Sequence, residues 1–66
     1  MQVQVNGEML QLQDGITLTS LVEQLELGEK RIAIELNLEI IPRSQHAETV
    51  LKESDRVEIV HAIGGG

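Results

Sequence analysis

The chain must build its core without any aromatic ring and without any disulfide. Its 66 residues include no Phe, Tyr, Trp or Cys, so Val, Ile, Leu and Met have to fill the interior. A domain of this size buries only about 60% of the surface that its unfolded chain exposes, and such small folds usually need very regular packing. We therefore expect one simple layered domain with no room for a deep ligand pocket.

The first 13 residues show the alternation of a β-hairpin. Apolar side chains alternate with polar ones on both sides of a turn signal, and the apolar positions are Val3, Val5, Leu10 and Leu12. The turn signal is Asn6-Gly7, a pair that tolerates the positive φ angles of a type I′ turn. The pattern predicts a hairpin over residues 1–13.

A short amphipathic helix is expected after Asp14-Gly15, which ends the hairpin. The apolar side chains of this helix share one face, because they are spaced three and four residues apart: Leu18, Leu21, Val22 and Leu25. Thr17 or Thr19 is the expected N-cap, and Gly28 stands where a left-handed C-cap residue is expected. Such a helix should lie on one face of a sheet.

Three further strands are predicted along the rest of the chain. Alternation indicates a strand over residues 32–37, and Asn37-Leu38 is the expected turn. Ile40-Ile41 forms a very short fourth strand, which stops at Pro42 because proline cannot donate to a ladder. The two isoleucines face opposite sides of the sheet, so one of them can be exposed. Residues 56–63 form the last strand.

A brief helical turn is predicted between the fourth and last strands, with Ser44 as its cap. Its apolar side chains share one face: Ala47, Val50 and Leu51. In the last strand, Val57 and Ile59 point inward. Strict alternation would also turn His61 and Ile63 inward, which indicates a bulge or the rim of the sheet at that point.

The element order is strand, strand, helix, strand, strand, short turn, strand. If the first and last strands lie side by side, the sheet is mixed and the helix covers one of its faces. This is an α+β architecture of about five strands, the β-grasp or ubiquitin-like fold. We expect residues 1–63 to form this domain and residues 64–66 to form a flexible C-terminal glycine tail.

Charge narrows the possible partners. Eleven acidic residues against five basic ones give a formal charge of −6, which disfavours nucleic acid and anionic membrane as partners. No stretch approaches the ~18 apolar residues of a membrane helix, and the N-terminus does not resemble a signal peptide. With no Cys, these features fit a cytoplasmic protein. The charge favours a protein partner with a basic surface, although solubility alone explains it equally well.

The strongest functional signal is the ending Ile63-Gly64-Gly65-Gly66. Three glycines cannot pack and they add chain entropy, so folding alone does not explain them. Extended, they reach at most about 10 Å beyond the fold, and they are thin enough to enter a partner's active-site channel. The C-terminal carboxylate of Gly66 would then be the reactive group. A flexible linker is the alternative interpretation.

A carboxylate must be activated before it reacts, and adenylation by ATP is the usual solution. A sulfur nucleophile would then give a thiocarboxylate, whereas an amine would give an amide.

The other groups that could carry chemistry give weaker signals. His46 and His61 have no Cys and no suitable carboxylate spacing, so we expect surface or rim histidines. Glu23 and Glu26 are expected on a solvated helix face rather than in acid–base catalysis. We expect no catalytic residue, no metal and no cofactor.

The second face of the sheet is expected to be largely uncovered, because one helix covers only one face. The apolar side chains expected there are Val60, Ala62, Ile63 and one of Ile40 or Ile41. A patch of this kind usually marks a protein interface. The alternative is that the turn around residues 47–51 covers it.

Six segments, in this order and spacing, carry a family resemblance: VQVNG at 3–7, DGITLTSL at 14–21, IELN at 34–37, IPR at 41–43, DRVEIV at 55–60 and AIGGG at 62–66. Together they span essentially the whole chain, which resembles the ThiS family, the sulfur carriers of thiamine (thiazole) biosynthesis. The minimal ending of that family is two glycines, so the third glycine is a departure.

The resemblance implies that the chain is a protein co-substrate and not an enzyme. A ThiF-like adenylyltransferase would adenylate Gly66, and a cysteine desulfurase would be the source of the sulfur. A ThiG-like thiazole synthase would then take the sulfur from the thiocarboxylate into the thiazole ring. The small subunit of molybdopterin synthase is the nearest alternative, although those proteins are usually longer and often contain aromatics. A ubiquitin-like modifier and a passive binding module with an inert tail are the others.

Overall fold

The computed structural model describes residues 1–27 and 32–61, and its elements follow the predicted order. They are β1 (Gln2–Val5), β2 (Glu8–Gln11), α1 (Leu18–Gln24), β3 (Ile32–Leu36), β4 (Glu39–Ile41), the 3-10 turn η1 (Arg43–Gln45) and β5 (Arg56–His61). The predictions made for Gly28, Ala62 and residues 63–66 lie outside the described residues.

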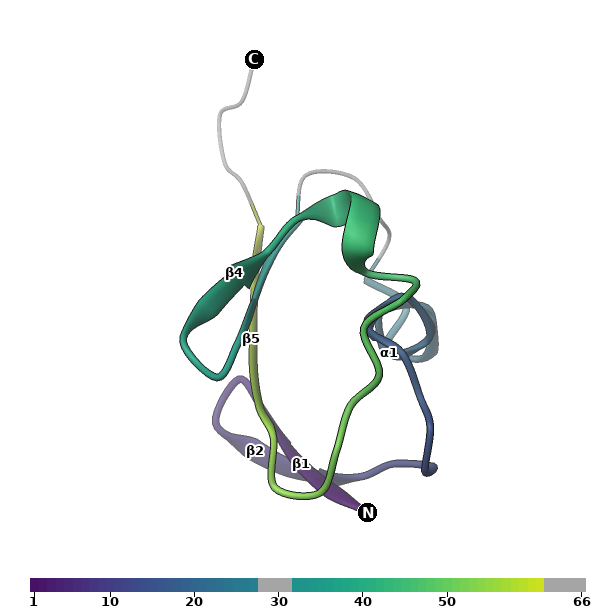
Figure 1. Cartoon of the computed structure of the whole chain (residues 1–66). Helices are drawn as coiled ribbons and strands as arrows, with labels where there is room; N and C mark the ends of the chain where they lie inside the picture. Colours follow the sequence, from purple (N-terminus) through teal and green to yellow (C-terminus); the bar gives the residue numbers. More distant parts are fainter. Residues whose placement is uncertain (28–31, 62–66) are drawn as a thin grey trace.

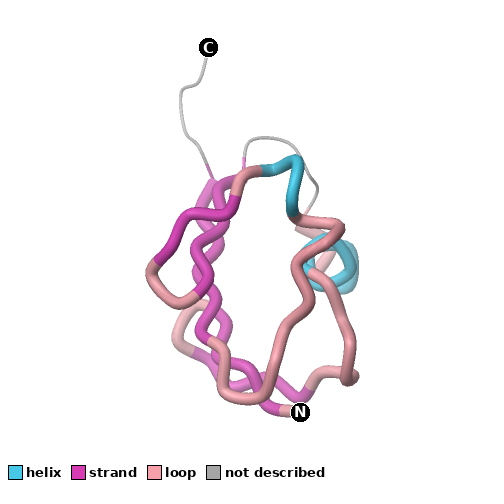
Figure 2. Tube along the Cα trace, in the orientation of Figure 1, coloured by secondary structure: helices cyan, strands magenta, loops and turns pink. Residues whose placement is uncertain are grey.

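The five strands form one mixed sheet in the order β2-β1-β5-β3-β4. β1 and β5 run parallel, with Val5 beside Val57, and the other neighbouring strands pair antiparallel. α1 and the connection from β4 to β5 lie on the same side of this sheet (Figures 1 and 2). The predicted mixed sheet with a helix on one face is therefore confirmed.

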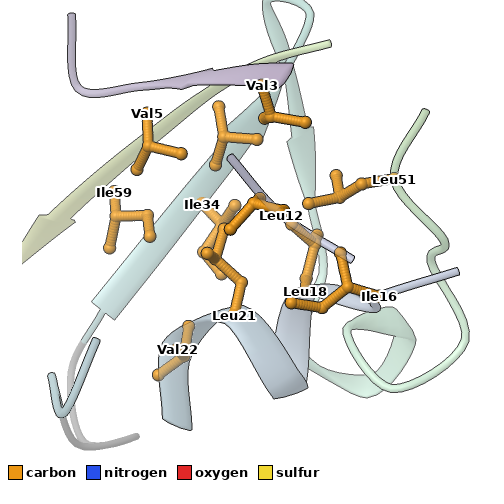
Figure 3. Packing of buried hydrophobic residues seen from close by; sticks show 11 residues of the cluster. Val3, Val5, Leu12, Ile16, Leu18, Leu21, Val22, Ile34, Leu51 and Ile59 are labelled. Carbon is orange, nitrogen blue, oxygen red and sulfur yellow. The ribbon is translucent and has the colours of Figure 1, made fainter. Parts of the chain in front are cut away.

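The core between the sheet and α1 is entirely aliphatic, as the composition requires. Its buried side chains are Val3, Val5, Leu12, Ile16, Leu18, Leu21, Val22, Ile34, Leu51, Val57 and Ile59. Figure 3 shows the leucines of α1 reaching toward Ile34 in the middle of the sheet. Because aliphatic interiors depend on close packing, removing several methyl groups from any of these side chains should cost about 2–5 kcal/mol.

Two hairpin turns have the same backbone form. Asn6 and Gly7 have φ angles of 50° and 85°, and Asn37 and Leu38 have φ angles of 52° and 73°. Each pair connects two antiparallel strands through a two-residue loop, so both residues of each pair have the positive φ of a type I′ turn. Both predicted turns are confirmed.

The side chain of Asn6 has a second role, because it extends the pairing of β5 beyond the end of β1. The N–H of Asn6 donates to the carbonyl of Val57 at 2.9 Å. The N–H of Ile59 donates to Asn6 Oδ1 at 2.7 Å, where a further strand residue would otherwise supply a carbonyl. This bond to Asn6 thus holds β5 two residues further toward the C-terminal end of β5 than its pairing with β1 reaches.

The start of α1 agrees with the prediction, whereas its end shows a residue that the sequence did not suggest. Thr17 is the N-cap, and its hydroxyl oxygen accepts from the N–H of Ser20 at 3.2 Å. Thr19 is therefore not the cap. Accepting from this N–H satisfies one of the donors left free in the first turn of a helix.

At its C-terminal end, α1 is closed by Glu26, which has a φ of 58°. The N–H of Glu26 donates to the carbonyl of Glu23 at 3.1 Å, and the N–H of Leu27 donates to the carbonyl of Val22 at 3.3 Å. This bond pattern is the Schellman motif, in which glycine usually has the left-handed position. We assigned that position to Gly28 because a glycine was expected, but a glutamate closes the helix.

The connection between β4 and β5 differs from the prediction. Ser44 lies inside η1, and the residue at the N-cap is Pro42, which makes no side-chain cap bond. Ala47 and Val50 are exposed, and only Leu51 is buried. The predicted cap and the predicted apolar face are therefore wrong, because the segment forms one 3-10 turn and then an extended stretch.

His46 is the side chain that enters the interior from this connection. It is only 7% exposed, and its Nε2 lies 2.9 Å from the carbonyl oxygen of Ile41. Its own carbonyl accepts from the N–H of Thr19 at 3.3 Å. The expectation of a surface histidine is wrong for His46, because a hydrogen-bonded polar group can be buried at little cost. It is right for His61, which is exposed.

Replacing Glu26 by glycine should stabilise the protein. A left-handed φ costs a residue with a Cβ about 1–2 kcal/mol, and a carboxylate near a helix C-terminus adds a smaller penalty. After the greater chain entropy of glycine is subtracted, we expect Glu26→Gly to raise the free energy of unfolding by about 1 kcal/mol in urea titrations. Glu26→Ala removes the charge but keeps the Cβ, so it should gain less than about 0.5 kcal/mol. Equal stability of the two variants would contradict this explanation.

Removing the acceptor on Asn6 should loosen β5. Asn6→Gly keeps the positive φ free of strain but leaves the partly buried N–H of Ile59 without its partner, which should lower the free energy of unfolding by about 1–2 kcal/mol. Asn6→Asp keeps an acceptor in the same place and should stay within about 0.5 kcal/mol of the wild type. Hydrogen exchange at Ile59 is the second readout, and unchanged protection in Asn6→Gly would refute the role of this bond.

Candidate functional site

β5 is the strand that leads to the glycine tail, and it lies in the middle of the sheet. It pairs with β1 on one side and with β3 on the other, over rows from Leu36–Val57 to Ile32–His61. β1 lies beside the first residues of β5 only, Arg56 and Val57, and Figure 1 shows β5 continuing beyond the end of β1. The predicted site residues Ile63, Gly64, Gly65 and Gly66 lie outside the described residues, so their position stays a prediction.

The face of the sheet opposite α1 carries the exposed side chains of the central strands. Val60 is 58% exposed and pairs with exposed Ala33. Ile40 is 72% exposed, whereas Ile41 is partly buried against the core. The expectation that one of the two isoleucines is exposed is therefore confirmed, and Ile40 is that residue. We call Ala33, Glu35, Ile40, Glu58 and Val60 the free face.

Two carboxylates lie in the middle of the free face. Glu35 pairs directly with Glu58 across β3 and β5, and Glu35 also pairs with Ile40 across β3 and β4. Like charges directly opposite each other in a sheet are destabilising. A partner that brings a Lys or Arg side chain to this row would remove that repulsion, so the free face fits a partner with a basic surface.

The turn around residues 47–51 does not cover the free face. The N–H of Leu51 donates to the carbonyl of Ile16 at 2.9 Å, and the N–H of Leu18 donates to the carbonyl of Thr49 at 3.1 Å. These bonds hold the connection beside the start of α1, on the core side of the sheet (Figure 2). The alternative in which this segment shields the apolar side chains is therefore wrong.

The groups that we considered for other chemistry do not come together. Glu23 and Glu26 are exposed, as expected of a solvated helix face. Within residues 1–27 and 32–61, no three His, Cys, Asp or Glu side chains are placed so that they could hold a metal ion. The same part of the chain contains no pocket and no helix long and apolar enough to cross a membrane.

Sequence reasoning missed two asparagines that fix the site. Asn6 bonds to β5 as described above, and Asn37 Oδ1 accepts from the N–H of Arg56 at 3.0 Å, at the start of the same strand. We identified both only as turn residues. No local pattern indicates these two bonds, because they depend on which strand lies beside each turn.

Comparison with known proteins agrees with this geometry. The model of the ThiS family matches residues 3–66. The sulfur carrier protein ThiS of Escherichia coli (strain K12) is 32% identical over 66 residues, which are 100% of both chains. A thiazole synthase from Paramagnetospirillum magneticum is 36% identical over the whole of this chain, but the chain spans only 20% of that relative.

The solved structures show the same fold. The crystal structure of a thiamine biosynthesis protein (ThiS) from Geobacter metallireducens superposes with a TM-score of 0.87 at 29% identity, covering 100% of both chains. The β-grasp expectation is thereby confirmed, and the sequence relationship extends through the free face and the glycine tail. The chain belongs to the ThiS family.

Proposed function

We propose that this chain is a sulfur carrier of thiamine biosynthesis and that its reacting group is the C-terminal carboxylate of Gly66. Family membership supports the first part, because a ThiS relative that aligns with this chain from end to end is named a sulfur carrier protein. Such a protein is a carrier and not a catalyst. The second part is carried by one observation: the family match continues through residues 64–66, which have no side chains.

In this proposal the folded domain anchors the tail and limits where the carboxylate can lie. Residues 1–63 form the folded domain and residues 64–66 the arm that enters a partner, with Ile63 at its base. β5 pairs with β1 at Arg56 and Val57 and with β3 as far as His61, so the arm follows a strand that is held inside the sheet. A rigid base limits the positions that the carboxylate can reach, and this lowers the entropy lost when a partner binds it.

The chemistry needs an enzyme, because a carboxylate is a poor electrophile. A ThiF-like adenylyltransferase would let the Gly66 carboxylate attack the α-phosphorus of ATP, releasing pyrophosphate and forming an acyl adenylate. A persulfide formed by a cysteine desulfurase and passed on would then attack the carbonyl carbon and expel AMP, which keeps one former carboxylate oxygen. A thiol would reduce the resulting acyl disulfide, which leaves a thiocarboxylate on Gly66 and a disulfide on the sulfur donor.

A ThiG-like thiazole synthase is the proposed acceptor of this sulfur. The support is that a segment similar to this whole chain occurs within a protein named thiazole synthase. Joining a carrier to its acceptor in one chain raises their effective concentration. The free face has exposed apolar side chains around two paired carboxylates. It therefore offers such partners a second contact besides the tail, and this contact favours a partner with basic side chains.

Changing the end of the chain should abolish charging without changing the fold. Deleting Gly66, or adding one residue after it, moves the reactive carboxylate away from the position that the adenylating site can use. Intact mass spectrometry after incubation with the adenylating enzyme, ATP and a sulfur donor should show exchange of one oxygen for sulfur in the wild type only. Thermal unfolding serves as the control for folding. Normal charging of either variant would refute the assignment to Gly66.

The same reaction separates the competing functions. High-mass conjugates would indicate a ubiquitin-like modifier, and no mass change with any cognate enzyme would indicate a passive module. Rescue of a thiamine auxotroph, but not of a mutant lacking molybdenum cofactor, is the outcome expected for a thiazole sulfur carrier.

A further inference from the structure

The two hairpin turns of this chain are built alike except for one residue. Each begins with an Asn whose side-chain oxygen accepts from a backbone N–H of β5. The next residue has a φ of 85° in one turn and 73° in the other. It is Gly7 in the β1–β2 turn, as that angle favours, but it is Leu38 in the β3–β4 turn.

Leu38 is unfavourable for the isolated protein on two counts. A left-handed backbone strains a side chain with a Cβ, and this strain is absent for glycine. The side chain is also 73% exposed, so it gains little from burial within the protein. Residues with a strained backbone are concentrated at functional positions, and Gly7 shows that the same turn can be built without strain.

The β3–β4 turn is also held firmly in place. Asn37 Nδ2 donates to Asp55 Oδ1 at 3.0 Å, and the N–H of Asn37 donates to the carbonyl of Arg56 at 2.8 Å. Asp55 is buried, and its other carboxylate oxygen accepts from the N–H of Lys52 at 2.7 Å. Leu38 is therefore presented from a turn that is fixed before any partner arrives, which reduces the entropy lost on binding.

Leu38 is continuous with the free face. Ile40 is two residues further along the chain and is also largely exposed, and its row across the sheet continues through Glu35 to Glu58. Val60 and Ala33 form the next row, toward the end of β5. Exposed apolar side chains thus occur from the β3–β4 turn to Val60 near the end of β5, with Glu35 and Glu58 between them.

We propose that Leu38 is a docking anchor for the enzyme that adenylates Gly66, and that it enters an apolar pocket bordered by Lys or Arg side chains. This inference rests on the proposed function. A glycine tail offers no side chain by which an enzyme could select it, so selection has to use the folded domain. Ile40 is the second apolar contact, and the basic groups face Glu35 and Glu58, which lie in the same row of the sheet as Ile40.

A second copy of the chain does not fit this surface. Each copy has a formal charge of −6, and self-association through the free face would bring the paired carboxylates Glu35 and Glu58 of two chains together. A basic partner removes the repulsion that a second copy would increase. Charge complementarity therefore favours a basic partner over a second copy, and the adenylating enzyme is the proposed occupant because it must recognise the folded domain before it acts on the tail.

The test compares binding with stability for full-length Leu38 variants. Leu38→Gly should raise the Tm by about 4–8 °C, because it relieves the turn, and should weaken the Kd for the adenylating enzyme at least about tenfold in calorimetry. Leu38→Ala keeps the Cβ, so it should weaken the Kd similarly while the Tm changes by less than about 2 °C. Leu38→Met should keep the Kd within about threefold of the wild type.

Gly7→Leu is the matched control, because it introduces the same residue at the same position of the other turn. It should lower the Tm and leave the Kd within about threefold of the wild type. The proposal would be overturned if Leu38→Gly and Leu38→Ala both bound the enzyme with the Kd of the wild type. It would also be overturned if the wild type sedimented as a dimer and Leu38→Gly as a monomer.

Charging assays separate this inference from the proposed function. At saturating enzyme, Leu38→Gly should still exchange oxygen for sulfur at Gly66, because its tail is intact. If the wild type is not charged at all, the proposed function fails. If the wild type is charged while the Leu38 variants bind as it does, only the docking anchor fails.

Discussion

The parallel pairing of β1 with β5 joins the two ends of the described chain in the middle of the sheet. Val5 lies beside Val57, and both side chains are buried in the core. β1 carries β2 on its other side, and β5 carries β3 and through it β4. Without this pairing, the hairpin β1–β2 would be separated from the three-stranded sheet β5-β3-β4, and an isolated two-stranded hairpin is at best marginally stable in water.

The two faces of the sheet have different tasks because of this arrangement. One face packs against α1 and the β4–β5 connection, and its aliphatic side chains supply the stability of a small domain. The other face carries side chains that contribute little to folding, including a pair of opposed carboxylates and exposed Val60 and Ile40. The part of the chain that the structure describes contains no pocket, and in the proposed function this second face serves recognition while partners perform the chemistry on the tail.

Local patterns in the sequence were enough to predict most of the elements. Asn6-Gly7 and Asn37-Leu38 gave the two turns, alternation gave the strands, and Thr17 was among the two expected caps, because each of these depends on neighbours along the chain. The pairing of β1 with β5 was expected from the element order and the resemblance, since periodicity alone contains no information about which strands lie side by side.

The errors concern contacts that no local sequence pattern indicates and one position that lacks the preferred residue. His46 is buried because the fold brings the carbonyl of Ile41 to its ring, and no pattern around His46 indicates that acceptor. Glu26 closes α1 against the preference for glycine. The side-chain bonds from Asn6 and Asn37 to β5 were also missed, because they require the sheet order. The glycine tail was the reverse case, since the sequence alone suggested its role.

The central position of β5 has a consequence for how the protein is made. β5 comes last among the described elements, so a ribosome has synthesised most of the chain before the sheet can close around it. A product that ends before β5 lacks the strand that links β1 to β3, and its apolar side chains stay accessible to proteases. Folding therefore acts as a check on completeness: chains that survive in the cell have been translated at least through the strand that precedes the glycines.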